Sequence, residues 1–362
     1  MNHTLRVLFV IPGDGSGSSM IFVRRQIDSL RSAGVTAAEF YLPTRTSPAG
    51  LLRERHRLRQ MLRDFAPHLV HAQYGTVTAC FCLLSTRLPV VITFRNSDLN
   101  PCPEISRVRS AVGRLLSQFA VLGASAITCV SEQLRGRLWW RREAAQVIPS
   151  GVDLDVFYPR SKGEARAELG WRMDERVIVF NAGGDPLRKR LDLAQRAAEM
   201  TSSSLDAVRL CVLDGGTPPG SVPVYLNAAD CLLVTSLFEG SPNIVKEAMA
   251  CDLPVISVDV GDVRERLDGI CPSAIVSPEP NEIARQLVEV LSRPVRSNGS
   301  TKVEEISTRA VAGRILRVYQ AALGRKEFVR PGDVPVAVAA ARSARVKDDR
   351  TVNPRRREGH GT

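Results

Sequence analysis

One stretch of the sequence, residues 231–251, constrains the fold and the chemistry of this chain more than any other. Residues 231–234 are an uninterrupted apolar run, which predicts a strand buried on both faces of a parallel sheet. Residues 244–251 have the spacing of a short helix, and residues 240–243 supply the Gly, Ser, Pro and Asn that are typical of a turn. A strand, a turn and a helix in this order leave backbone N–H groups unpaired at the start of the helix, where an anion can bind.

Two glutamates flank this predicted anion site. Glu239 precedes the turn and Glu247 lies about one helical turn beyond it, so both carboxylates can face the same crevice. Carboxylates accept hydrogen bonds from hydroxyl groups, whereas the amides of the turn suit phosphate. The combination predicts a ligand that carries both phosphate and hydroxyl groups, as a nucleotide sugar does. The alternative is an ordinary strand-to-helix turn with two surface carboxylates.

A second cluster of charge, formed by Arg188, Lys189 and Arg190, follows Gly183 and Gly184. The glycines come directly after an apolar run, and the cations fall where a helix is predicted to begin. Cations at a helix start oppose the helix dipole unless an anion binds there. The cluster therefore predicts a site for the negative charge that develops on a departing diphosphate. The alternative is a solvated basic helix start.

Strand-like and helix-like segments alternate along the chain, which predicts an α/β fold with parallel, doubly wound sheets. The predicted strands are residues 5–11, 36–41, 68–73, 89–94, 126–130, 177–182, 208–214, 230–235, 254–258 and 274–276. The predicted helices include residues 20–32, 50–65, 76–86, 105–122, 131–141 and 303–322. Ligands of such sheets bind beyond the carboxyl ends of the strands, so the glycine loop with Gly15 and Gly17 is expected to border the crevice.

These motifs, taken together, resemble those of glycosyltransferase family four, whose members are retaining enzymes with the GT-B fold. The resemblance is carried by the two glutamates with seven residues between them, by residues 251–257 and 261–262, and by residues 147–153, which match the interdomain signature. It implies two Rossmann-like, doubly wound domains that face each other across a cleft. The acceptor-side domain is expected over residues 1–155, and the nucleotide-sugar domain over 156–324, with its last helix returning to the first domain. It also implies transfer from a nucleoside diphosphate sugar without a cofactor or bound metal.

The resemblance assigns roles to individual residues. Glu239 is expected to face the donor sugar, Glu247 to hold the nucleotide ribose, and Lys189 matches the family lysine. Gly184 stands where the family has an arginine, which Arg188 or Arg190 can replace. The predicted catalytic residues are Glu239, Lys189 and Arg188. The predicted donor-binding residues are Gly15, Gly17, Gly183, Gly184, Arg190, Gly240, Ser241, Pro242, Asn243, Ile244 and Glu247.

On the acceptor and sugar side, the predicted residues are His71, Arg95 and Asp98. Where the family usually has His-Gly, this chain has Arg95 and Asn96. Arginine cannot accept a proton at neutral pH, so Arg95 cannot act as a general base. We therefore expect it to be a fixed cation that selects a charged group on the donor or the acceptor. The alternative is a surface ion pair between Arg95 and Asp98. A second departure lies in residues 214–227, where a family strand is missing and the identity of the base stays open.

The charge of the chain is unevenly distributed. Residues 1–150 contain nineteen Arg, no Lys and nine acidic residues, whereas residues 151–324 hold twenty basic and twenty-four acidic residues. No nucleic-acid reader motif accompanies the basic half, so a carbohydrate or lipid-linked acceptor and an anionic membrane surface are the predicted partners, and nucleic acid is not. The basic helix 50–65 and the Trp pair within 137–142 are the candidate membrane contacts, and the alternative for the helix is core packing with a solvated arginine face.

Several further expectations concern location and pathway. No apolar run approaches the ~18 residues that cross a bilayer, and the chain is expected in the cytoplasm, with a peripheral position at the inner face of the membrane as an option. The eight cysteines are predicted to be reduced, and the basic segment 325–362 to be disordered. Family analogy suggests cell-envelope or exopolysaccharide assembly. A GT-B sugar-nucleotide epimerase and a non-catalytic scaffold that binds nucleotide sugars stay open as alternatives.

Overall fold

The computed structural model describes residues 4–16, 20–102 and 105–324. Gly17, predicted to bind the donor, and the tail 325–362, predicted to be disordered, lie outside the described residues. All eight cysteines are described, and all are free thiols, as predicted.

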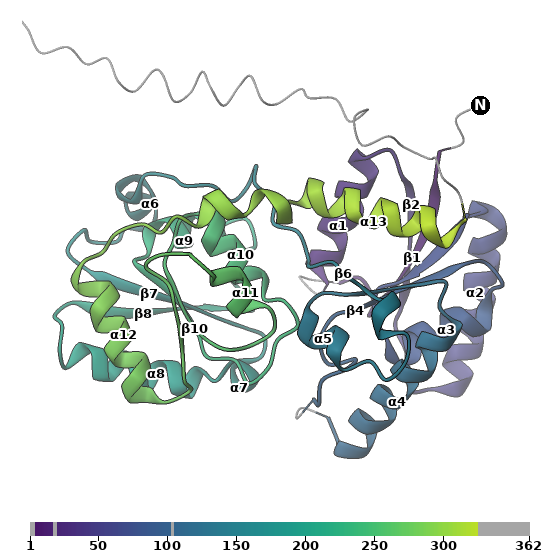
Figure 1. Cartoon of the computed structure of the whole chain (residues 1–362), viewed down its shortest axis with the longest axis horizontal. Helices are drawn as coiled ribbons and strands as arrows, with labels where there is room; N and C mark the ends of the chain where they lie inside the picture. Colours follow the sequence, from purple (N-terminus) through teal and green to yellow (C-terminus); the bar gives the residue numbers. More distant parts are fainter. Residues whose placement is uncertain (1–3, 17–19, 103–104, 325–362) are drawn as a thin grey trace, which may run out of the picture. The chain divides into compact units, whose positions relative to one another are not determined.

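Six parallel strands form the first sheet, in the spatial order β2-β1-β3-β4-β5-β6 (Figure 1). Their bounds are β1 (Arg6–Pro12), β2 (Thr36–Leu42), β3 (Leu69–Ala72), β4 (Val90–Phe94), β5 (Ala126–Cys129) and β6 (Gln146–Val147). In the central pairing, Val10 lies opposite Phe40 of β2 and Ala72 of β3. The order of strands reverses at β1, because β2 and β3 flank it on opposite sides, and such a switch point opens a crevice.

Five parallel strands form the second sheet, in the order β11-β10-β9-β7-β8. Their bounds are β7 (Arg176–Gly183), β8 (Val208–Asp214), β9 (Cys231–Val234), β10 (Val255–Val258) and β11 (Ala274–Val276). Here the order reverses at β7, which has β8 on one side and β9 on the other. The predicted α/β class with two doubly wound parallel sheets is confirmed.

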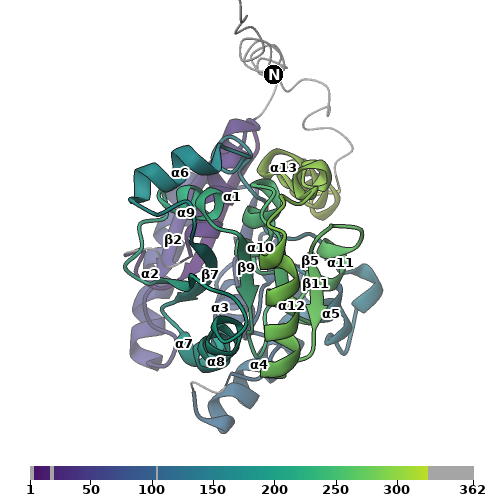
Figure 2. The same ribbon diagram turned by 90° about the vertical axis from the view of Figure 1, so that its left-hand side faces the viewer.

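Helices cover both faces of each sheet. Those of the first half are α1 (Ile21–Ser32), α2 (Pro48–Phe65), α3 (Thr76–Ser85), α4 (Arg107–Gly123) and α5 (Glu132–Gly136). Those of the second half are α6 (Lys162–Leu169), α7 (Pro186–Lys189), α8 (Leu191–Ser202), α9 (Val222–Ala228), α10 (Asn243–Ala250), α11 (Val263–Leu267), α12 (Pro280–Ser292) and α13 (Thr308–Ala322). In the second sheet, α8 and α12 cover one face and α9 and α10 the other, as Figure 1 and the turned view in Figure 2 show.

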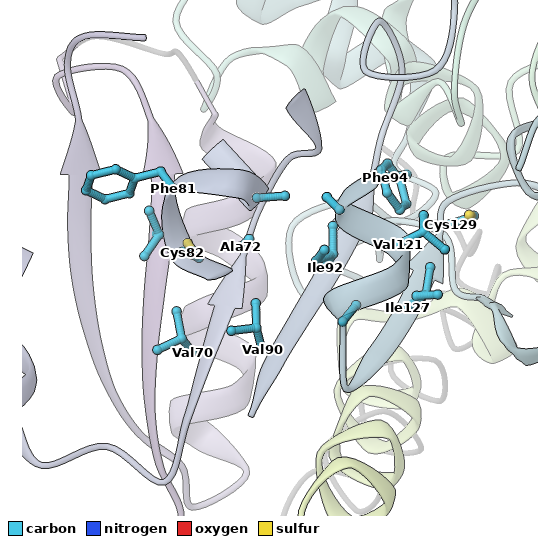
Figure 3. Packing of buried hydrophobic residues seen from close by; sticks show 14 of the residues in the cluster. Val70, Ala72, Phe81, Cys82, Val90, Ile92, Phe94, Val121, Ile127 and Cys129 are labelled. Atoms are coloured by element: carbon cyan, nitrogen blue, oxygen red, sulfur yellow. The ribbon is translucent and has the colours of Figure 1, made fainter. Parts of the chain in front are cut away.

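The alternation of side chains along β1 explains why the first sheet has a hydrophobic core on each face. Leu8 and Val10 join a core with α2, α3 and α4, whereas Phe9 and Ile11 join a core with α1 and α13 on the opposite face. Figure 3 shows part of the first core, where side chains of β3, β4 and β5 meet α3 and α4. The labelled residues are Val70, Ala72, Phe81, Cys82, Val90, Ile92, Phe94, Val121, Ile127 and Cys129.

The terminal helix α13 belongs to a core of the first sheet, although it follows the second sheet in sequence. The Ser29 hydroxyl donates a hydrogen bond to the Thr308 carbonyl at its start, at 2.8 Å, and Arg314 donates to the Val147 carbonyl. Both sheets lie in one compact unit of the chain, so the predicted domain boundary at residue 155 stays a prediction.

Two predicted helices are shorter than expected. The helix that begins after Ser131 ends at Gly136, because Gln118 of α4 binds the backbone of the next residues, accepting from Trp139 N–H and donating to the Arg137 carbonyl. The helix predicted from residue 303 begins at Thr308, where Ser307 caps it by accepting from Ala310 N–H. In both places tertiary or capping hydrogen bonds outweigh a continuous helical pattern.

Candidate active site

The site is built where β7 and β9 end side by side. Because the two strands pair in parallel, the loop after Gly183 and the loop after Val234 leave the same edge of the sheet. Hydrogen bonds join these loops: Leu237 N–H donates to the Arg188 carbonyl at 2.9 Å, and the Thr235 hydroxyl donates to the carbonyls of Lys189 and Arg190. The fold therefore fixes the cation cluster next to the glutamate-bearing turn.

Glu239 lies at the centre of a buried charge cluster. One carboxylate oxygen lies 2.5 Å from Lys189 Nζ and 3.0 Å from Arg188 Nη1, and it accepts a hydrogen bond from the Ser236 hydroxyl at 2.9 Å. Burial disfavours the charged carboxylate, but Lys189 and Arg188 outweigh that effect and hold the pKa of Glu239 below its ordinary value. Glu239 is therefore ionised at neutral pH.

The turn after Glu239 is shaped by close backbone packing. A Cβ on Gly240 would lie 1.7 Å from the Arg95 carbonyl oxygen, so only glycine fits there. Helix α10 then begins at Asn243 behind Pro242, without a hydrogen bond from a capping side chain. No capping side chain among the described residues therefore occupies its first backbone N–H groups, and the anion site predicted there stays a prediction.

Glu247, one turn into α10, forms an ion pair with a residue that the sequence did not single out. Arg25 of α1 donates to its carboxylate, with Nη1 2.9 Å from Oε1, although 222 positions separate the two residues. Burial raises the pKa of Glu247, and the charge of Arg25 partly offsets the rise. Arg25 lies in the first predicted helix, but no local signal marks it, because its partner comes from the other half of the chain.

A cavity of about 720 Å³ lies between these groups and the loops of the first sheet, within the usual range for ligand sites. It is lined by twelve of the predicted residues: Arg95, Gly183, Gly184, Arg188, Lys189, Glu239, Gly240, Ser241, Pro242, Asn243, Ile244 and Glu247. Arg25, Asn181 and Asp214 also line it and were not predicted. The two motifs that the sequence singled out therefore meet in one cavity.

Four predicted residues lie elsewhere. Gly15 packs against the ring of Tyr41: a Cβ added to Gly15 would lie 3.1 Å from the nearest ring carbon. Gly15 does not line the cavity. Arg190, in the left-handed conformation with φ 58°, separates α7 from α8 and pairs with the exposed Asp192 on the surface. The cations Arg188 and Lys189 therefore stand at the end of a short helix and not, as predicted, at the start of one.

The other two misplaced residues are buried. His71 lies 2.7 Å from the hydroxyl of Tyr319 and 2.7 Å from that of Thr93, and burial together with the charge of Arg95 lowers its pKa to about 3. Asp98 accepts hydrogen bonds from the backbone N–H groups of Gly75, Arg95 and Asn96, and so closes a loop. Neither side chain lines the cavity, so the geometry gives no support to the sugar-side role predicted for both.

Arg95 does line the cavity, and its side chain is almost completely buried. Its guanidinium donates to Ser150, Gln26 and Gln73, all neutral, and lies 4.8 Å above the ring of Phe22. Its Nε has no hydrogen-bond partner among the described residues, and Asp98 meets its backbone N–H and not its guanidinium. The predicted alternative of a surface ion pair with Asp98 is therefore wrong.

The described residues contain neither a cluster of metal ligands nor a helix that could span a membrane. No group of three or more His, Cys, Asp or Glu side chains is arranged to hold a metal ion within residues 4–16, 20–102 and 105–324. Within the same ranges, no helix combines the length and the apolar character that a bilayer crossing requires.

Two family models match the chain. Residues 14–156 match a model described as Glycosyltransferase Family 4, and residues 175–293 match one described as Glycosyl transferases group 1. A Bacillus subtilis glycosyltransferase named for teichuronic acid biosynthesis, TuaC, is 29% identical over an alignment of 256 residues, and the match covers 64% of this chain. The match spans 62% of the length of TuaC, and about half the length of several D-inositol 3-phosphate glycosyltransferases that the chain also resembles.

Solved structures resemble the chain over most of its length. Sucrose-phosphate synthase from Thermosynechococcus elongatus superposes with a TM-score of 0.69 and 17% identity, over 88% of this chain and 99% of that one. Anabaena Alr3699/HepE, solved with UDP and glucose, has a TM-score of 0.68 and 15% identity, over 88% of this chain and 100% of the other. At these identities the likeness concerns the fold alone.

Proposed function

This chain belongs to glycosyltransferase family four and has the GT-B fold, and we propose that it moves a sugar, with retention, from a nucleoside diphosphate sugar to a carbohydrate or lipid-linked acceptor. Its membership makes it an enzyme that transfers glycosyl groups. The epimerase and the non-catalytic scaffold that the sequence left open have no support in the matched family models.

The observation that carries the proposal is the buried cluster of Lys189, Arg188 and Glu239 beside the uncapped start of α10. Two cations and a set of backbone N–H groups converge on one wall of a cavity large enough for a nucleotide sugar. When the glycosidic bond breaks, the diphosphate gains negative charge, and preorganised cations stabilise that charge without reorganisation. The similar fold of Anabaena Alr3699/HepE, which was solved in complex with UDP and glucose, supports the choice of ligand.

The chemistry assigned to the two glutamates follows from their ionisation. Because the pKa of Glu239 is lowered, its carboxylate is a fixed negative charge beside the donor sugar and not a proton donor. A fixed negative charge stabilises the positive charge that develops at the anomeric carbon. Glu247 accepts hydrogen bonds from the ribose hydroxyls once Arg25 releases it.

The acceptor proton goes to the leaving group in this proposal. The acceptor hydroxyl attacks the anomeric carbon, the bond to the diphosphate oxygen breaks, and that oxygen takes the hydroxyl proton. Lys189 and Arg188 hold the diphosphate during this exchange. His71 and Asp98 take no part, since both side chains are buried away from the cavity.

Arg95 is proposed to select an anionic group on the donor or the acceptor. It is a buried cation at the cavity wall, and within the described part of the chain its guanidinium binds neutral side chains and its Nε has no partner. A carboxylate or phosphate on the substrate would supply the missing counter-ion, and a guanidinium suits planar, two-pronged contacts with such groups. The TuaC relative is named for the biosynthesis of an acid, teichuronic acid, which agrees with an anionic group on the substrate. We also propose a role in cell-envelope polysaccharide assembly.

The same proposal includes location and metal use. We place the reaction in the cytoplasm, at the inner face of the membrane, where sugar nucleotides and lipid-linked acceptors meet. Charge at the diphosphate is handled by Lys189, Arg188 and the α10 amides, so no bound metal is required.

The test is release of nucleoside diphosphate. The full chain is incubated with UDP-, GDP- and ADP-sugars, with and without a chelator and with candidate acceptors, and the products are followed by mass spectrometry. We expect release with one base class, unchanged by the chelator. Conversion of a donor into its epimer, or no release with any donor and acceptor pair, would contradict the proposal.

Calorimetry with the free nucleoside diphosphate tests the ribose contact separately. Glu247→Ala should weaken binding by about 1.5–3 kcal/mol, the usual contribution of hydrogen bonds to a charged group. Glu199→Ala, on the exposed face of α8, is the matched control and should bind like wild type. Equal affinity in both variants would remove Glu247 from the donor site.

A further inference from the structure

Helix α4 carries apolar side chains on two faces. One face packs into the first core through Ala120 and Val121. The other is exposed to solvent. It consists of Val108, Val112, Leu115, Phe119 and Leu122, which are 43–74% exposed. Their spacing repeats at helical period, so they form a single stripe along the helix. In Figures 1 and 2 no labelled element lies beyond α4, which is at the lower edge of both views.

The stripe continues onto two tryptophans. Trp139 is 63% exposed and Trp140 38%, and the Trp140 ring lies 5.8 Å from the Phe119 ring. Gln118 of α4 fixes the backbone on either side of Leu138, because it accepts from Trp139 N–H and donates to the Arg137 carbonyl, each at 2.9 Å. The stripe and the Trp pair are thus held together as one rigid apolar face, which we call the α4 face. Contiguous exposed apolar patches of this kind mark interaction sites.

Charge around the α4 face is strongly positive. Residues 105–143 contain seven arginines and two glutamates, and one of the glutamates, Glu132, is paired with Arg135. Arg107, Arg109, Arg137, Arg141 and Arg142 are exposed. Apolar side chains, exposed tryptophans and flanking arginines are the combination that an anionic bilayer surface selects, since rings enter the headgroup region and arginines meet lipid phosphates.

We propose that the α4 face docks this protein in the plane of an anionic lipid bilayer. The sequence had suggested α2 and the Trp pair as membrane contacts. The structure favours α4 over α2, because among the large apolar side chains of α2 only Leu52 is exposed, and Leu58 faces the core.

The first turns of helix α4 are linked to the active-site cavity by a hydrogen bond. Cys102 lines the cavity, and its backbone N–H donates to the Ser110 hydroxyl in the first turns of α4 at 3.1 Å. A docked α4 would therefore bring the cavity mouth to the lipid surface. This step rests on the proposed function: it makes the acceptor one that a lipid anchors, whereas the docking itself does not depend on glycosyl transfer.

Flotation with lipid vesicles tests the proposal on the full chain. Wild type is mixed with vesicles of phosphatidylcholine alone, or of phosphatidylcholine with phosphatidylglycerol, at low and high salt. We expect binding to the anionic vesicles that weakens with salt, because the arginine contribution is screened. Phe119→Ser combined with Trp139→Ser should lower the partition coefficient at least tenfold. Leu52→Ser on α2 is the matched control and should bind as wild type does.

A second pair of variants tests the charge. Arg107→Gln with Arg109→Gln should weaken binding to anionic vesicles, and Arg53→Gln with Arg59→Gln on α2 should not. Binding of nucleoside diphosphate should be unchanged in all variants, which shows that they are folded and separates this proposal from the proposed function. Absence of wild-type binding to anionic vesicles at low salt would overturn the proposal, as would α4 variants that bind like wild type. A wild-type dimer that Phe119→Ser dissociates, without vesicle binding, would assign the face to a second copy instead.

Discussion

Two buried arginines, one in each half of the chain, are held in opposite ways. Arg166 is fully buried under the second sheet and donates from every nitrogen: to the carbonyls of Ala228, Arg172 and Met173, and to the carboxylate of Asp230 at 2.8 Å. Arg95 is almost as buried, but its partners are neutral and its Nε has none among the described residues.

The difference separates a structural cation from one kept for a ligand. A buried charge that is fully paired and hydrogen-bonded belongs to the folded architecture. A buried charge without a counter-ion is unfavourable in the free protein, and burial accordingly lowers the pKa of Arg95 to about 10 although Asp98 opposes the shift. Its position at the cavity wall gives it the chance to gain a counter-ion on binding.

The largest expected effect is on stability, at Arg166. Arg166→Met removes one of the two cations that pair with the buried Asp230, the other being Lys162, and removal of one member of a buried pair typically costs about 3–5 kcal/mol. Urea denaturation of the full chain measures the loss. Arg172→Met, which removes an exposed ion pair with Asp174, is the control and should change stability little. A small effect at Arg166 would end the contrast between the two arginines.

Lys189 combines the two situations, because it lines the cavity and also pairs with Glu239. Its substitution tests whether such a paired cation contributes to catalysis. Lys189→Ala should lower kcat about 10²-fold, because a fixed charge on the leaving diphosphate is lost. It also removes one of the two cations that pair with the buried Glu239, so the free energy of unfolding should fall as well. Arg190→Ala is a matched control, since Arg190 is the neighbouring cation but pairs with Asp192 at the surface. Turnover equal to wild type in Lys189→Ala at saturating donor would exclude the residue from the mechanism.

Substitution of Arg95 should affect activity more than stability, whereas substitution of Arg166 should affect stability. Arg95→Gln should lower kcat/KM on the true substrate pair about 10- to 100-fold, as charged hydrogen bonds of about 1.5–3 kcal/mol disappear. Its stability should stay within about 1 kcal/mol of wild type, because a buried charge without a counter-ion is removed. Arg95→Lys should be a poor substitute, since an ammonium cannot make the two-pronged contact. Full activity in Arg95→Gln would refute the assignment.

The parts of the site that were predictable rest on local signals. The apolar runs of β7 and β9, the glycines after β7 and the turn residues after β9 mark where strands end, and parallel pairing brings those ends together. Lys189 and Glu239 could therefore be placed in one cavity from sequence.

The parts that were missed depend on contacts between distant segments. His71 lies in β3, a strand that the sequence predicted, but α13, which packs over it through Tyr319, makes that face of the sheet a core. Arg25 reaches Glu247 only because α1 and α10 approach each other in the fold. Arg190 has a positive φ and interrupts a helix, although it is not the glycine that usually marks such a position. None of these outcomes has a signal within a few residues of the side chain concerned.

The smallest expected effect concerns a third buried cation, Lys246 of α10, which differs from both arginines because it can lose its proton. Its Nζ donates to the Ser241 hydroxyl at 2.8 Å. Burial lowers its pKa from 10.5 to about 8, Asp262 and Glu247 oppose the shift, and Arg266 and Arg95 add to it. Between pH 8 and 10.5 the unfolded chain therefore holds a proton that the folded chain has released.

Because the unfolded state binds more protons in that window, the free energy of unfolding contributed by Lys246 should rise with pH, by at most about 1.4 kcal/mol per pH unit for one proton. The comparison with Lys246→Met isolates this contribution, since other titrating groups are common to both proteins. Denaturant unfolding at pH 7.5, 8.5 and 9.5 should show wild type gaining stability relative to the variant at each step. If the difference in unfolding free energy stayed constant across these pH values, Lys246 would keep its charge when buried. Asp262 would then act as its counter-ion, as Asp230 does for Arg166.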